Sequence, residues 1–193
     1  MNTRKANAYV LTFVGVMAAM VYVVTLFRFP LLGSKVHFAN AVCLLSGLLL
    51  GPWWGGLAAG LGSALYDAFA GGYDLINVLI TLVSKFLMAF VCGKLLEKPG
   101  RDEDPRWTIP AGILGALTYV ALYMLKTFIY QRFVYSFPMD AVWATMLSKL
   151  IPSLINAAVA VVAAPIFYHA LKPALRSAGI WDKLKGGKPA VSK

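Results

Sequence analysis

The sequence predicts an all-α integral membrane protein: a bundle of six transmembrane helices with both termini in the cytoplasm. Three observations lead to this prediction. Of the 193 residues, 60% are apolar, only 13% are charged, and long uncharged stretches alternate with short charged ones. A soluble domain usually carries about a quarter charged residues, and so apolar a surface would not remain soluble. Residues 1–193 are predicted to form a single membrane domain.

The first predicted span covers residues 6–27 and contains no charged residue. At about 1.5 Å per residue, a helix of this length crosses the hydrocarbon core of a bilayer. Residues 28–35 are predicted to form a loop, because Pro30 and Gly33 interrupt regular structure.

The next uncharged stretch, residues 36–66, is too long for one ordinary span. The pair Gly51-Pro52 divides it into two short predicted spans, 36–50 and 53–70. A single long and kinked helix is the alternative, and the topology of the whole chain can decide between them.

Three further spans are predicted at residues 75–93, 107–130 and 141–171. A polar linker rich in proline and glycine joins the first two, and a second loop joins the last two. The chain ends in a basic tail, 172–193, whose residues 173–184 could lie along the inner membrane interface. Each of these three spans contains one lysine, namely Lys85, Lys126 and Lys149.

The distribution of positive charge supports six spans. The six-span topology places twelve lysines and arginines inside, three outside and three within the membrane. Cytoplasmic segments are typically the richer in these residues, so both termini are predicted to be cytoplasmic. A net charge of +10 would suggest nucleic acid in a soluble protein. Here the charges flank apolar spans, and no basic-aromatic module accompanies them, so we expect no nucleic-acid partner.

Polar residues recur at helical spacing on the last three spans, so each set shares one face of its helix. Polar faces within a membrane point to the bundle interior or to a cavity. The three sets are Asn77, Thr81 and Lys85; Tyr119, Tyr123, Lys126 and Tyr130; and Trp143, Met146, Lys149, Ser153 and Asn156.

Lys85 and Lys149 lie roughly 13–16 Å from the outer ends of their spans, too deep to reach the interface easily. Lys126 lies closer to the outer end. Asp67 is the only carboxylate within a predicted span. A buried ammonium needs an acceptor, and a ligand carboxylate or phosphate could supply one. Pairing with backbone carbonyls, polar side chains and water is the alternative.

No motif for catalysis occurs. The sequence lacks a G-x-x-x-x-G-K-[ST] phosphate loop, an HExxH motif, paired intramembrane aspartates and a His/Cys metal cluster. We therefore expect no catalytic residues, no metal, no cofactor and no enzymatic activity. The glycine-rich third span is predicted to pack closely within the bundle, and Gly15-x-x-x-Ala19 on the first span is a similar small patch.

Two sequence segments and the span after them carry a family resemblance. The first segment is Lys35-Val-His-Phe-Ala-Asn-Ala-Val, and the second is Leu-Leu-Leu-Gly-Pro-Trp-Trp-Gly-Gly-Leu-Ala-Ala-Gly-Leu-Gly-Ser-Ala-Leu-Tyr-Asp67. The fourth span, which contains a lysine, follows them. With six spans in about 190 residues, the chain resembles the substrate-binding S component of an energy-coupling factor (ECF) vitamin transporter. The Leu-Gly-Pro-x-x-Gly-x-x-x-Gly segment ending in aspartate is the most specific part of the resemblance.

The resemblance implies a prokaryotic plasma-membrane protein that binds a vitamin or its precursor from outside. It implies docking onto a transmembrane coupling protein that carries two ATPase subunits. In the family an Ala-x-x-x-Ala patch on the first span makes this contact, and Gly15 and Ala19 are the nearest equivalent here. It also implies that the loop after the first span caps a site built from the outer halves of the fourth to sixth spans.

We therefore expect high-affinity capture of a small, water-soluble vitamin or precursor for ATP-driven uptake with partner ECF subunits, and the excess of lysines favours an anionic one. A stand-alone secondary transporter is the main alternative, and a subunit without a ligand is a third possibility. The predicted substrate-binding residues are Lys35, His37, Asn40, Asn77, Lys85, Tyr123, Lys126, Trp143, Lys149 and Asn156.

Overall fold

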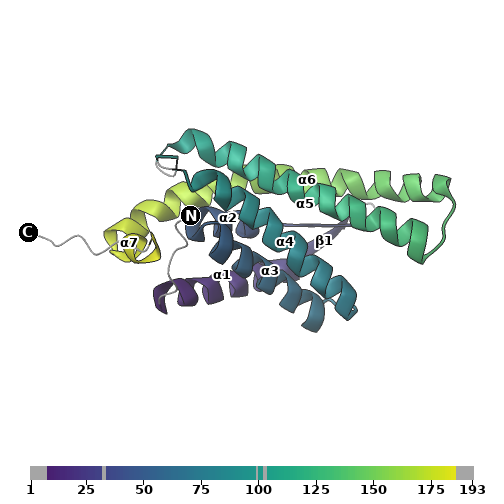
Figure 1. Cartoon of the computed structure of the whole chain (residues 1–193), viewed down its shortest axis with the longest axis horizontal. Helices are drawn as coiled ribbons and strands as arrows, with labels where there is room; N and C mark the ends of the chain where they lie inside the picture. Colours follow the sequence, from purple (N-terminus) through teal and green to yellow (C-terminus); the bar gives the residue numbers. More distant parts are fainter. Residues whose placement is uncertain (1–7, 32–33, 99, 102–103, 186–193) are drawn as a thin grey trace, which may run out of the picture.

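The computed structural model describes residues 8–31, 34–98, 100–101 and 104–185. Helix α1 (Ala8–Leu26) leads into an antiparallel hairpin of β1 (Arg28–Leu31) and β2 (Ser34–His37). The elements that follow are α2 (Ala39–Leu50), α3 (Pro52–Phe69), α4 (Leu75–Leu96), η1 (Pro105–Trp107), α5 (Thr108–Ile129), the π-helix η2 (Tyr130–Val134), α6 (Met139–Ser177) and α7 (Ile180–Lys185). Figure 1 shows α5 and α6 side by side along the long axis of the molecule, with α7 at one end.

The helical membrane fold is confirmed. Within the described residues, four helical segments are long and apolar enough to cross a membrane: α1, α4, α5 continued through η2, and α6. Helix α2 is apolar but has only 12 residues, or about 18 Å, which is shorter than the hydrocarbon core of a bilayer. The number of six spans and the cytoplasmic termini stay predictions.

Gly51 separates α2 from α3, as the two-helix interpretation predicts. Its φ of 80° lies in the left-handed region, which glycine adopts without steric cost. Pro52 then occupies the first turn of α3, where its missing N–H costs no helical hydrogen bond. Every residue of α2 is buried. The helix therefore forms the centre of the bundle.

Residues 28–35 are predicted as a loop, but the structure has most of the β1–β2 hairpin there. Arg28 pairs with His37 and Pro30 pairs with Lys35. Proline cannot donate a ladder hydrogen bond, so it is excluded from central strands. Both strands of a two-stranded ribbon are edges, and Pro30 is therefore tolerated.

Small residues bring the helices into close contact around α3. A Cβ atom at Gly55 would clash with the backbone oxygen of Ser46 on α2, and one at Gly62 would clash with that of Ala18 on α1. The glycine-rich run thus serves bundle packing, as the sequence predicts.

The start of α1 and the C-terminal helix lie at the same end of the molecule (Figure 1). The Lys183 Nζ atom donates a hydrogen bond to the Tyr9 hydroxyl at 3.1 Å. Trp181 is only 5% exposed, and its ring lies edge-on to that of Tyr168. The predicted interfacial segment 173–184 therefore ends in a helix that covers the bundle. Residues 186–193 of the predicted tail lie outside the described residues.

Candidate substrate-binding site

A cavity of about 450 Å³ lies at the hairpin end of the bundle. This volume is within the range typical of small-molecule sites. Most of the lining side chains come from β2, helices α2 to α6 and η2, and Thr25 on α1 and Tyr73 between α3 and α4 add to them. Because the hairpin follows the C-terminal end of α1, the cavity lies away from the end at which α7 contacts Tyr9.

The structure brings nine of the ten predicted substrate-binding residues to this cavity: Lys35, His37, Asn40, Asn77, Lys85, Tyr123, Lys126, Lys149 and Asn156. Trp143 does not line it and is 59% exposed. Lys149 lies six positions after Trp143. At about 100° per residue, the two side chains therefore leave α6 in directions about 120° apart. Ligand contact by the nine residues stays a prediction.

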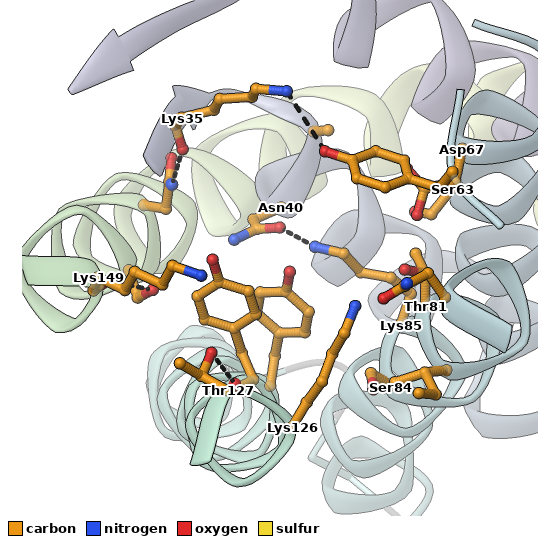
Figure 2. Close-up of a pocket in the computed structure, with 18 of the residues that line it drawn as sticks. Lys35, Asn40, Ser63, Asp67, Thr81, Ser84, Lys85, Lys126, Thr127 and Lys149 are labelled. Carbon is orange, nitrogen blue, oxygen red and sulfur yellow. Dashed lines mark hydrogen bonds between the residues drawn. The ribbon is translucent and has the colours of Figure 1, made fainter. Parts of the chain in front are cut away.

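Lys85 is the most enclosed cation of the site, with only 4% of its surface exposed. Its ammonium group donates a hydrogen bond to Oδ1 of Asn40 on α2. The same group lies 3.5 Å from the ring centroid of Tyr119 on α5, a favourable cation–π distance. Lys85 on α4 thus joins three helices at one side of the cavity, and Figure 2 shows its contact with Asn40.

Lys126 and Lys149 approach the cavity from α5 and α6, and Figure 2 shows both side chains pointing toward the centre. Within the described part of the chain, neither ammonium group makes a hydrogen bond or a salt bridge, although Lys126 lies 5.7 Å from the ring centroid of Tyr130. The lining contains four lysines and a single carboxylate, Asp67. The described cavity wall therefore has a formal excess of three positive charges.

The hairpin is attached across the cavity at two places. The Asn156 side chain on α6 accepts a hydrogen bond from the His37 backbone N–H at 2.9 Å and donates one to the Lys35 carbonyl at 2.8 Å. On the other side, Lys35 Nζ donates to the Tyr73 hydroxyl at 3.3 Å. Asn156 uses both groups of its amide on the backbone of β2, so it positions the hairpin.

His37 and Gln131 both line the cavity, and each has one buried polar atom without a partner in the described part of the chain. Within the described residues, His37 Nδ1 and Gln131 Oε1 are buried without a hydrogen-bond partner. Burial, followed by the positive charges of Lys85, Arg28 and Lys35, lowers the pKa of His37 to about 3. The imidazole is therefore neutral at physiological pH.

Several lining residues were not predicted as part of the site. Ser63 and Asp67 lie on α3, Tyr73 lies between α3 and α4, and Gln131 lies on η2. Asp67 was recognisable as the lone intramembrane carboxylate, and Tyr119 as part of a polar stripe. Among the described residues, no group of three His, Cys, Asp or Glu side chains could hold a metal ion.

Comparison with known proteins identifies the family. Residues 5–173 match the family model for the S component of ECF-type riboflavin transporters. A solved structure described as "Structure and mechanism of the S component of a bacterial ECF transporter" is similar, with a TM-score of 0.67 and 16% sequence identity. The similarity covers 86% of this chain and 97% of that one, and at this identity it shows a shared fold.

No curated protein matches the sequence. The family match nevertheless spans most of the 193 residues. This chain belongs to the family of ECF-type riboflavin transporter S components.

Proposed function

We propose that this protein captures a small, water-soluble vitamin or vitamin precursor with an anionic group from outside the cell. Partner ECF subunits then use ATP to drive its uptake. Family membership supports vitamin capture, with riboflavin as the substrate that the family's description names. The anionic group is inferred from one observation, the excess of lysines over carboxylates in the cavity lining.

The lysines of the cavity differ in whether they already have partners. Lys85 is hydrogen-bonded to Asn40 and lies against Tyr119. Lys126 and Lys149 face the cavity, and Asp67 can balance only one of them. A ligand carboxylate or phosphate would form charge-assisted hydrogen bonds, which are stronger than neutral ones. An anionic ligand group therefore fits this cavity better than a cationic one.

We propose that ATP is hydrolysed by partner subunits and not by this chain. Its sequence contains no G-x-x-x-x-G-K-[ST] loop for ATP. We propose that a transmembrane coupling protein and two ATPase subunits supply the energy, and that α1 docks on the coupling protein through Gly15 and Ala19. Both residues are exposed on α1.

Mass spectrometry of the ligand retained through purification tests the substrate proposal. We expect a vitamin-sized metabolite with a carboxylate or phosphate group, present in about equimolar amount. Recovery of uncharged riboflavin would keep vitamin capture and contradict the anionic group. A protein that purifies without any small molecule, and that binds none of the water-soluble vitamins in calorimetry, would contradict capture itself.

We also propose six spans with both termini in the cytoplasm. The twelve-to-three distribution of cations supports this topology, as does the contact between α7 and the start of α1. Reporter fusions after Lys193, and inserted into the linker near Gly100, should both indicate the cytoplasm. An extracellular reporter at either place would require a different number of spans.

A further inference from the structure

Two buried polar atoms of the cavity have no partner within the described chain: His37 Nδ1 and Gln131 Oε1. Buried polar groups in proteins are almost always hydrogen-bonded, and exceptions call for an explanation. Both atoms belong to residues that line the same cavity. The two residues lie far apart in the sequence, His37 on β2 and Gln131 on η2.

The backbone holds Gln131 in an unusual conformation. Gln131 lies in the π-helix that follows α5, and such single π-turns occur frequently at functional sites. Its backbone oxygen accepts a hydrogen bond from the Phe137 N–H at 3.0 Å. Between these residues, Ser136 has a φ of 54°, which is uncommon for a residue other than glycine. The positive φ of Ser136 is energetically unfavourable, and it occurs next to a segment whose Gln131 lines the cavity.

The π-turn brings Gln131 slightly closer to the polar face of α5. The polar face of α5 includes Tyr123, Lys126 and Tyr130, which line the cavity. A regular helix rotates about 100° per residue, which would turn Gln131 away from the centre of this face. A π-turn contains more residues, so each residue rotates less, and Gln131 stays nearer to the polar face.

The position of His37 is fixed through its backbone. Its N–H donates to Asn156 Oδ1, and the pairing of β2 with β1 places Arg28 opposite it. The neutral ring can offer either a donor or an acceptor at Nδ1, depending on its tautomer. The imidazole is therefore held in place, while Nδ1 has no hydrogen-bond partner within the described residues.

We propose that His37 and Gln131 are specificity-determining residues, which hydrogen-bond uncharged polar groups of the bound vitamin. Gln131 Oε1 requires an N–H or O–H group on the ligand, whereas His37 Nδ1 pairs with a donor or an acceptor. The lysines of the cavity would then bind the anionic group of the ligand. This inference rests on the proposed function and extends it to the uncharged part of the ligand. A site with such paired polar groups discriminates strongly against analogues that lack them.

The test uses the full chain in detergent with two substitutions, His37→Phe and Gln131→Met, which remove the hydrogen-bonding atoms. His37→Asn retains a polar atom near Nδ1. Phe133→Leu is the matched control, because Phe133 lies on the same π-helix, is 70% exposed and does not line the cavity. Melting temperature without ligand and riboflavin titration are measured on all variants. Riboflavin has no ionised group at neutral pH, so its affinity reports the uncharged contacts.

We expect His37→Phe and Gln131→Met each to weaken riboflavin binding about tenfold or more. The melting temperature without ligand should stay the same or rise, because a buried unpaired atom is removed. His37→Asn should recover part of the affinity, and Phe133→Leu should change neither quantity. Unchanged riboflavin affinity in both variants would overturn the inference.

Failure of the proposed function gives a different result. If the unmodified protein does not bind riboflavin, the flavin substrate is excluded, and the melting temperatures still decide about the two residues. A lower melting temperature for both His37→Phe and Gln131→Met would show that the two groups stabilise the fold, and it would overturn the inference. An equal or higher melting temperature for both variants would support the inference.

Discussion

Replacing Lys149 with methionine should weaken ligand binding roughly tenfold to a hundredfold and leave the bundle folded. A charge-assisted hydrogen bond contributes about 1.5–3 kcal/mol, and each 1.4 kcal/mol changes affinity about tenfold. Methionine keeps most of the volume of the side chain and removes the charge. Since no described residue pairs with the Lys149 ammonium, the melting temperature without ligand should stay the same or rise.

Lys85→Met should weaken binding to a similar extent but with a different effect on stability. Loss of the Lys85 ammonium leaves Asn40 Oδ1 buried without this donor, and it removes the cation from the face of the Tyr119 ring. An unsatisfied buried acceptor costs about 1–3 kcal/mol, which offsets the gain from removing a buried charge. We therefore expect the Lys85 variant to be less stable than the Lys149 variant.

Calorimetry with the ligand identified by mass spectrometry, together with melting temperatures, distinguishes these outcomes. Lys94→Met is the control, because Lys94 lies on the same helix as Lys85, has half of its side chain exposed and forms a surface salt bridge with Glu97. Such pairs contribute little to stability, so this variant should bind normally. If affinity is unchanged in both the Lys85 and Lys149 variants, the argument for an anionic ligand fails.

Hydrophobic pattern and helix breakers predicted the course of the chain closely. The structure has a helix, α3 (Pro52–Phe69), where a span was predicted at 53–70, because Gly51 and Pro52 mark its start clearly. The hairpin was not predicted. Its strands have four residues each, and Asn156, more than a hundred positions away, supplies two hydrogen bonds to it. Because this contact joins residues so far apart, no local sequence pattern near residues 28–37 could predict the hairpin.

The site was predictable where regular helices present it. The spacing of Tyr123 and Lys126, and that of Asn77 and Lys85, follows a regular helix, and these residues line one cavity. Trp143 does not line the cavity, because its spacing from Lys149 departs from the helical period. Reasoning from helical spacing also missed Gln131, which lines the cavity from the π-turn after α5. Local departures from α-helical geometry cannot be recognised from an α-helical period.

Replacing Gly15 with leucine should reduce vitamin uptake about tenfold or more and leave ligand binding by the purified protein unchanged. No described atom outside its own stretch of helix lies within 4 Å of a Cβ placed at Gly15, and leucine favours a helix more than glycine does. The substitution is thus tolerated within this chain. It removes the close approach that a small residue permits to a neighbouring helix, so docking on the coupling protein should weaken.

The buried side of α1 shows why the two effects separate. Ala18 is 8% exposed and packs against Gly62 of α3, whereas Gly15 and Ala19 are exposed. Ala19→Leu should therefore act like Gly15→Leu. Uptake is measured in cells that also produce the coupling protein and both ATPase subunits, and Ala121→Leu, which adds the same bulk at an exposed position of α5, is the control. Loss of ligand binding in the Gly15 and Ala19 variants would assign the patch to internal packing, and vigorous uptake by this chain without its partners would favour a stand-alone secondary transporter.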